Sequence, residues 1–266
     1  MLPVGDPESI VFRKGEDMTP LKEALAAVSY PGRGIILGLN EQKDHAVMIY
    51  FIMGRSENSR NRIFVEEDSR LRTEPFDEAK VEDPSLIIYS PVRTIGCDTI
   101  VTNGDQTDTI YKELTKRQAQ KSEQLSFHQS IHVFDKALRR REYEPDAPNF
   151  TPRISGIAHI REGEYGYALN ILKADGAEKP ACLRQTVTYE VPRAGLGHYL
   201  HTYDGDGSPL PSFTGEPEAV ALEGDIDRIT DTAWEALNPV NKVSLYVRLV
   251  DLKNSRIKSR VVNKNR

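Results

Sequence analysis

Short apolar runs separated by polar turns mark the first part of the chain. Residues 34–40 and 45–54 are rich in β-branched and aromatic side chains, and a polar turn at Glu41–Asp44 separates them. Runs of this length and composition are typical of strands, and their continuous hydrophobicity favours burial. We therefore predict a pair of buried strands joined by a hairpin, with a further strand at 62–66.

The same criteria predict additional elements along the chain. Further strands are expected at 85–96, 98–104, 152–160, 165–174, 181–191 and 242–252. Helices are expected at 19–28, where Thr19 suits the cap and Pro20 the first helical position, and at 225–237. Residues 106–141 contain neither Gly nor Pro, which predicts one long helix or two consecutive helices with Ser122 as an internal cap.

Three segments lack a regular pattern. Residues 66–84 are acidic and contain two prolines, so we interpret them as a surface excursion. Residues 192–218 are rich in Gly, Pro, Asp and Tyr and predict a long functional loop. The basic tail at 253–266 is interpreted as a frayed end or an edge strand. Because strands and helices follow one another in blocks, the order predicts a layered α+β fold with antiparallel sheets, not a doubly wound parallel sheet.

Composition narrows the classes of function. The chain has 266 residues, of which 38% are apolar and 28% charged, as in an ordinary soluble protein. Its formal net charge of -5 argues against a whole-surface attraction to nucleic acid or to anionic membranes. No apolar run approaches the length of a membrane span. The two cysteines, Cys97 and Cys182, form no disulfide or metal-ligand framework, so we expect a reduced, cytoplasmic compartment.

The densest polar cluster directly follows the second apolar run. Residues 53–62 contain three arginines, two asparagines and two serines. Arginine presents a planar fork of donors that suits phosphate oxygens, and Ser and Asn add neutral donors. A loop at a strand end lets these donors converge on one anion. The alternative interpretation is a solvent-exposed polar turn.

Three other features carry candidate chemistry. Residues 102–108 lie at a strand-to-helix junction and form either a ligand site at a helix N-terminus or a turn capped by Asp105 or Thr107. Residues 140–146 form either an acid/base site or an exposed, salt-bridged helix end. Arg93 interrupts an apolar strand and needs a partner or a ligand. The six histidines have no metal-ligand spacing with a carboxylate or cysteine partner.

The order of these motifs carries more information than any one of them. The blocks are Tyr30-x-Gly32-Arg33, Arg55-Ser56 with Arg60 or Arg62, Tyr89 before Arg93, Thr102-Asn103-Gly104-x-x-Thr107-Asp108, Tyr143-Glu144 and Thr151-Pro152-Arg153-Ile154. In this order and at these separations they resemble the archaeal-type IMP cyclohydrolases. Looser matches follow at Tyr203-Asp204, Gly215–Glu218 and Asn238–Val240.

The resemblance implies a fold and a reaction. The fold is a four-layer αββα sandwich like that of the N-terminal-nucleophile hydrolases. It forms one domain over 1–266, with an N-terminal extension at 1–29 and the basic tail at 253–266. Because 29 residues precede Tyr30, we expect no free N-terminal nucleophile. The reaction closes 5-formamidoimidazole-4-carboxamide ribonucleotide to inosine monophosphate and water, a step of purine biosynthesis, without a metal or organic cofactor.

The resemblance also assigns site residues. The catalytic residues are Arg60 (or Arg62), Tyr89 and Glu144. The substrate-binding residues are Arg33, Arg55, Ser56, Asn58, Arg62, Arg93, Asn103, Gly104, Thr107, Asp108 and Arg153. One departure is that Ser90-Pro91 replaces the family's usual Asn-Cys after the tyrosine.

Two other functions stay open at this stage. One is a hydrolase or cyclase of a related carboxamide nucleotide or amide. The other is a purine-nucleotide-binding module without catalysis. The expected partner of the leading function is a small purine nucleotide substrate, with no nucleic acid and no membrane, and a homo-oligomer is possible.

Overall fold

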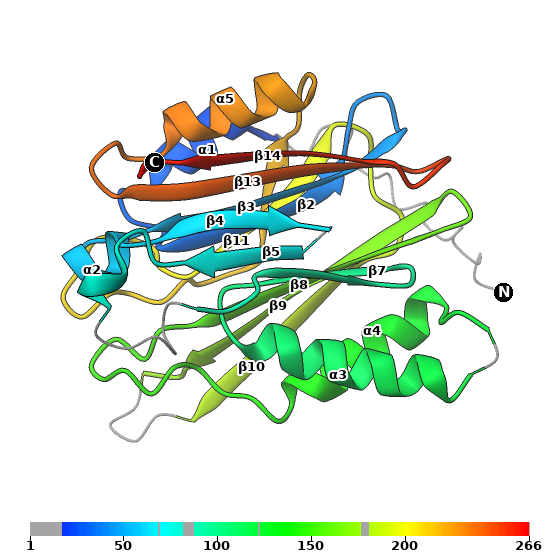
Figure 1. The fold of residues 1–266 in the computed structure, drawn as a ribbon, viewed down its shortest axis with the longest axis horizontal. Coiled ribbons are helices and arrows are strands. Elements are labelled where there is room, and N and C mark those ends of the chain that lie inside the picture. Colours follow the sequence, from blue (N-terminus) through cyan, green and yellow to red (C-terminus); the bar gives the residue numbers. More distant parts are fainter. Residues whose placement is uncertain (1–17, 69, 82–87, 122, 177–180, 266) are drawn as a thin grey trace, which may run out of the picture.

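The computed structural model describes residues 18–68, 70–81, 88–121, 123–176 and 181–265. Within them, two β-sheets pack face to face and helices cover the outer face of each sheet (Figure 1). Neighbouring strands are mostly antiparallel, although β1 pairs with β12 in parallel. The predicted α+β class with antiparallel sheets is therefore confirmed.

The first sheet has the order β1-β12-β11-β2-β3-β13-β14. Its strands are β1 (Thr19–Pro20), β2 (Arg33–Leu39), β3 (His45–Met53), β11 (Leu196–His201), β12 (Glu218–Ala221), β13 (Lys242–Asp251) and β14 (Ile257–Asn263). Its outer face is covered by α1 (Leu21–Ala27) and α5 (Ile226–Ala236). The tail thus forms an edge strand, one of the two predicted outcomes.

The second sheet has the order β10-β9-β8-β7-β6-β5-β4. Its strands are β4 (Ile63–Glu67), β5 (Arg70–Glu74), β6 (Val92–Ile95), β7 (Asp98–Thr102), β8 (Arg153–Arg161), β9 (Glu164–Ala174) and β10 (Cys182–Tyr189). Its outer face is covered by α3 (Gln106–Ala119) and α4 (Phe127–Leu138). The short helix α2 (Glu57–Arg60) lies between β3 and β4, and the 3-10 helix η1 (Glu78–Lys80) follows β5.

The four layers explain why the central strands are continuously apolar. Successive side chains of a strand point to opposite faces. In β3, Val47, Ile49 and Phe51 face the helices, whereas Met48 and Tyr50 face the second sheet. Because both faces are buried, no polar alternation remains in the sequence. Strands β2 and β3 pair in antiparallel register, so the predicted hairpin is confirmed.

The prediction of a long loop at 192–218 is wrong for part of its length. Residues Leu196–His201 form β11, which pairs with β2 and β12 near the middle of the first sheet. This strand was missed because Gly197 lies within it and glycine is typical of loops. A Cβ atom at Gly197 would lie 2.8 Å from Leu222 Cδ1 and 2.9 Å from Ile36 Cγ2. The glycine is therefore required by close packing and does not mark a turn.

Gly197→Ala tests this packing. We expect the added methyl group to lower the free energy of unfolding by about 1–3 kcal/mol, because a packed core resists added volume. Urea denaturation measures the change. Gly205→Ala is a suitable control, since the nearest heavy atom to its Cβ would be Pro211 Cγ at 3.9 Å. Equal losses in the two variants would contradict the packing explanation.

Three other predictions need correction or refinement. The surface excursion at 66–84 contains β5, which pairs with β4, and η1. The strand predicted at 85–96 is confined to Val92–Ile95, and 85–87 lie outside the described residues. Residues 106–141 form two helices, and Ser126 caps the second through a capping box with Gln129. The proposed cap Ser122 lies outside the described residues.

Within the described residues, no helix has the length and apolar character needed to cross a membrane.

Candidate active site

Residues far apart in the sequence meet at one end of the sandwich. Strand β2 begins at Arg33 and β8 begins at Arg153. The Thr151 and Tyr203 hydroxyls are hydrogen-bonded to each other, which joins the segment before β8 to the segment after β11. The segment before β8 leads into the second sheet, and the segment after β11 leaves the first sheet. The start of β2 and the start of β8 therefore border a common region between the two sheets.

Two arginines in this region have no acidic partner. Arg62 is only 5% exposed, and its Nε and Nη1 atoms donate no hydrogen bond. The buried Nε of Arg33 is also unpartnered. Among the described residues, neither guanidinium forms an ion pair. Buried charges are ordinarily paired and hydrogen-bonded, so the two arginines form a site that a bound anion would complete.

The two arginines influence each other. Burial and the positive charge of Arg33 lower the pKa of Arg62 to about 10. Burial also opposes the charge of Arg33, but the surrounding tyrosine hydroxyls outweigh it and raise the pKa of Arg33. Both guanidinium groups therefore stay protonated at neutral pH. The protein holds two like charges close together, which costs stability unless an anion is bound between them.

Tyrosine side chains surround the arginine pair. The tyrosines that act on Arg33 are Tyr30, Tyr50, Tyr89 and Tyr203. The Tyr89 hydroxyl lies 2.9 Å from the hydroxyl of the fully buried Tyr50, and either can donate the hydrogen bond. The Tyr30 and Tyr203 rings stack with centroids 6.0 Å apart. Tyrosine supplies both an aromatic face and a hydroxyl, so this environment suits a flat, polar ligand with an anionic group.

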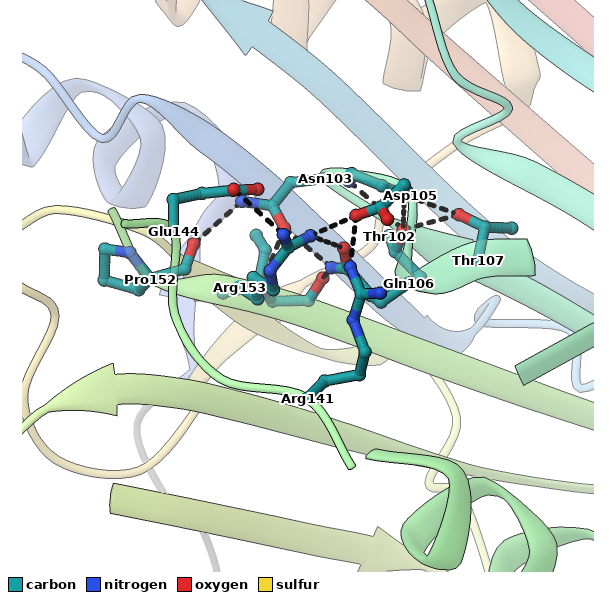
Figure 2. A network of polar contacts seen from close by, with 11 residues as sticks. Thr102, Asn103, Asp105, Gln106, Thr107, Arg141, Glu144, Pro152 and Arg153 are labelled. Carbon is teal, nitrogen blue, oxygen red and sulfur yellow. Dashed lines mark hydrogen bonds and ion pairs between the residues drawn. The ribbon is translucent and has the colours of Figure 1, made fainter. Parts of the chain in front are cut away.

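Glu144 lies beside this region and is held by Arg153 (Figure 2). Its Oε2 accepts a hydrogen bond of 2.9 Å from Arg153 Nη2. Burial raises the pKa of Glu144, the positive charge of Arg153 opposes that shift, and the negative charge of Asp105 adds to it. The positive charge of Arg33 also lowers the pKa of this carboxyl group, so Glu144 interacts electrostatically with one member of the arginine pair. A carboxyl group of raised pKa beside an anion site is suited to proton transfer.

The structure distinguishes the two candidate catalytic arginines by their surroundings. Arg60 ends α2, and its Nε and Nη2 donate to Gly54 O at 2.9 Å and Asn241 Oδ1 at 3.1 Å. The guanidinium of Arg62, two residues later, interacts with Arg33 and Tyr89, and its Nε and Nη1 atoms have no hydrogen-bond partner. Arg60 has a structural role that accounts for its position, whereas Arg62 does not. The geometry therefore favours Arg62.

The loop before α2 is more ordered than a free polar turn. Ser56 caps α2 through a reciprocal capping box with Ser59. Arg55 Nη1 lies 2.6 Å from Asp206 Oδ1, and its guanidinium lies over the Tyr30 ring at 5.2 Å. The Oδ1 atom of Asn58 is buried without a partner. Arg55 is thus near the tyrosine cluster but engaged by another loop, and Ser56 serves the helix.

The remaining predicted residues fall into two groups. Asn103 and Arg153 lie beside Glu144 (Figure 2). A Cβ atom at Gly104 would also lie close to Glu144, at 3.4 Å from its Oε1. Asn103 is a structural clamp there, since its Nδ2 donates to Pro152 O at 2.8 Å and its Oδ1 accepts from Ile154 N at 3.0 Å. The other group lies on the helical face of the second sheet. Arg93 pairs with Asp108 at 2.6 Å and lies over the Tyr111 ring at 3.4 Å, so it has partners without a ligand.

Thr107 also has a local role. Its hydroxyl bonds to Gly104 O at 3.0 Å and to the Thr102 hydroxyl. Asp105 occupies the N-cap position of α3, but its side chain forms no capping hydrogen bond. It pairs with Arg153 and Arg141 instead. The interpretation of 102–108 as a turn is therefore supported, whereas the predicted cap from Asp105 is wrong.

Several contributing residues were not singled out from the sequence. From the sequence, Tyr50 belongs only to a buried strand, and Gln106 lies within the 102–108 cluster without a role of its own. Tyr203 appeared in a loose motif, and its role in the tyrosine cluster follows from the placement of β11. A signal existed for Tyr50, because a hydroxyl in a run as apolar as 46–53 needs a partner when buried.

Comparison with known proteins identifies the family of this chain. The family described as IMP cyclohydrolase-like protein matches residues 30–255. A search of curated proteins finds no match. The matched segment includes every residue of the site described above and continues well beyond the motif blocks that end at Ile154. Because it covers most of the sequence, the chain belongs to the IMP cyclohydrolase-like protein family.

Proposed function

We propose that this protein is an IMP cyclohydrolase that closes 5-formamidoimidazole-4-carboxamide ribonucleotide to inosine monophosphate with release of water. The observation that carries the proposal is that Arg33 and Arg62, two neighbouring arginines without acidic partners, interact with Tyr89 and Glu144. Family membership supports the same reaction. The two packed sheets between helical layers support a fold like that of the N-terminal-nucleophile hydrolases, which we include in the proposal.

The proposed chemistry proceeds by addition and then elimination of water. The carboxamide nitrogen attacks the formyl carbon of the same molecule, a carbon–nitrogen bond forms, and Glu144 takes the proton that the nitrogen loses. The formyl oxygen becomes negatively charged and is stabilised by Arg62 and Tyr89. In the second step this oxygen takes the proton held by Glu144 and the proton of the nitrogen that carried the formyl group, and it leaves as water, which restores the Glu144 carboxylate. Holding both groups in attack geometry supplies much of the rate.

A turnover assay tests the proposal. The full chain is incubated with the formylated ribonucleotide, and formation of the hypoxanthine ring is followed by its absorbance. Turnover that disappears in Glu144→Gln supports the proposal. Tight binding of inosine monophosphate without turnover would overturn it in favour of a binding module. Turnover only on a related carboxamide nucleotide or amide would overturn it in favour of another hydrolase or cyclase.

Tyr89→Phe tests the role of the tyrosine hydroxyl. We expect kcat to fall about 10-fold to 100-fold with a smaller change in KM, because the hydroxyl acts on charge that develops only in the transition state. Steady-state kinetics measures both constants. Tyr111→Phe is the matched control, since Tyr111 lies against Arg93 on the opposite face of the second sheet. Wild-type kinetics in Tyr89→Phe would contradict the role.

A further inference from the structure

A network of arginine and aspartate side chains lies behind Glu144. Arg153 uses both arms of its guanidinium, with Nη1 2.6 Å from Asp105 Oδ1 and 2.8 Å from Gln106 Oε1, and Nη2 2.9 Å from Glu144 Oε2. Its side chain is only 9% exposed. Arg141 contacts the same Asp105 oxygen from the far side (Figure 2). Because several partners hold the guanidinium, the direction of its bond to Glu144 is strongly constrained.

Asp105 does not cap α3 with its side chain, although it occupies the N-cap position. An aspartate at an N-cap position normally accepts a backbone hydrogen bond, which is worth about 1 kcal/mol to the helix. The Asp105 carboxylate makes no such bond and instead bridges Arg141 and Arg153. Its contribution is therefore to the arginines and not to the start of α3.

Gly104 leaves space directly beside the same groups. A Cβ atom at this position would lie 3.0 Å from Arg153 Nη1 and 3.4 Å from Glu144 Oε1. The backbone thus approaches both members of the Arg153–Glu144 pair closely. A larger residue at this position would crowd both side chains, so the glycine leaves the room that the Arg153–Glu144 pair occupies.

We propose that Arg153 and Asp105 are positioning residues, which together fix the direction of the Glu144 carboxylate and the charge that this carboxylate experiences. The resemblance assigns Arg153 to the substrate, but its Nη1 and Nη2 atoms donate hydrogen bonds within the protein, and only the buried Nε lacks a partner. Arg153 acts on the reaction through Glu144. The expected effect on turnover rests on the proposed function. The expected effect on the Glu144 pKa does not depend on it.

The electrostatic consequence has opposite signs for the two residues. The charged groups that face Glu144 are Arg153 from β8, Asp105 at the start of α3, Asp146 from the same loop and Arg33 from β2. Arg153 lowers the pKa of Glu144 and Asp105 raises it, on top of the larger increase caused by burial. Loss of the Arg153 charge must therefore raise that pKa further. Loss of the Asp105 charge must lower it.

The experiment compares four variants of the full chain. Protein carrying ¹³C-labelled glutamate carboxyl groups is titrated by NMR without ligand, and the Glu144 signal is assigned by its loss in Glu144→Gln. Arg153→Gln is expected to shift the Glu144 midpoint upward by about one pH unit, and Asp105→Asn to shift it downward by a smaller amount. Arg153→Lys keeps the charge and is expected to leave the midpoint close to wild type. Arg140→Gln is the matched control, because Arg140 pairs with Glu113 outside the network.

Kinetics gives a second readout that a merely structural role would not produce. The acid limb of the kcat/KM profile is expected to move in opposite directions in Arg153→Gln and Asp105→Asn. Arg153→Lys is expected to lower kcat about 10-fold to 100-fold with little change in KM, since a single ammonium cannot hold two acceptors in the same geometry.

The outcomes separate this inference from the proposed function. Opposite midpoint shifts in a protein without cyclohydrolase turnover would support the inference and contradict the function. Turnover with an unmoved Glu144 midpoint, or with shifts of the same sign, would overturn the inference. If Arg153→Gln does not fold, the downward shift in Asp105→Asn and the kcat loss in Arg153→Lys decide the question, and absence of both overturns the inference.

Discussion

Arg62→Met is expected to abolish most cyclohydrolase turnover while making the free protein more stable. We expect kcat/KM to fall about 10²-fold to 10³-fold, the usual cost of removing a donor that stabilises transition-state charge. We expect the free energy of unfolding to rise by about 1–3 kcal/mol, because the substitution removes buried donors without partners and relieves repulsion from Arg33. Steady-state kinetics and urea denaturation measure the two effects.

The opposite signs make this result diagnostic. Replacing a residue that serves packing or structure lowers the stability of the protein. Replacing a residue that serves function can raise it. Arg60→Met provides the comparison, because its guanidinium is hydrogen-bonded to Gly54 and Asn241, and its replacement is expected to lower stability. Arg72→Met, which removes an arginine paired with Glu67 and Glu74, controls for a general change of charge. A larger loss of turnover in Arg60→Met than in Arg62→Met would reverse the assignment.

Glu144→Gln is expected to reduce kcat about 10²-fold to 10⁴-fold, the range associated with loss of a general acid or base. Only the carboxylate form can accept the amide proton, so wild-type activity is expected to fall as the pH drops through the Glu144 pKa. Burial raises that pKa above the ordinary value of 4.5. The acid limb of the profile therefore lies above 4.5, and Glu144→Gln removes this limb from whatever activity remains.

Stability provides an independent check with a defined sign. A carboxyl group whose pKa is higher in the folded than in the unfolded protein binds its proton more tightly when folded. Its stabilising contribution is full at pH values below 4.5 and is lost as the pH rises through the raised folded pKa. The stability of wild type relative to Glu144→Gln should thus decrease from pH 4 toward neutral pH. A difference that stays constant with pH, measured by urea denaturation, would contradict the raised pKa.

The sequence was most informative where local patterns and packing agree. The β2–β3 hairpin, the helix at Ile226–Ala236 and the strand at Lys242–Asp251 were all predicted near their observed bounds. Each is a long and strongly patterned segment. Strand β11 was missed because glycine is typical of loops, and only the close packing of Gly197 against Leu222 and Ile36 explains a glycine inside this strand.

The sequence predicted some residues of the site correctly and assigned others to it that have local structural roles. The ordered motifs brought Arg33, Tyr89 and Glu144 together as candidates before any geometry was known. They could not separate residues that face the region between the sheets from residues that serve local structure. Arg93 satisfied the criteria for a ligand residue, yet Asp108 and Tyr111 account for it fully.

The α+β class, most of the strands and helices, the family and the concentration of arginines at strand ends can therefore be predicted from the sequence, because each depends on residue type and spacing. The sequence does not show which arginine is left without a partner. Arg60 and Arg62 are two residues apart, but the first contacts Gly54 and Asn241 whereas the second lies with Arg33 and Tyr89. Tyr89, Arg62 and Arg33 come from separate segments, and Glu144 is oriented by Asp105 through Arg153. Burial and charge pairing arise only when these segments meet, so the unpaired Arg62 and the raised pKa of Glu144 are properties of the folded chain.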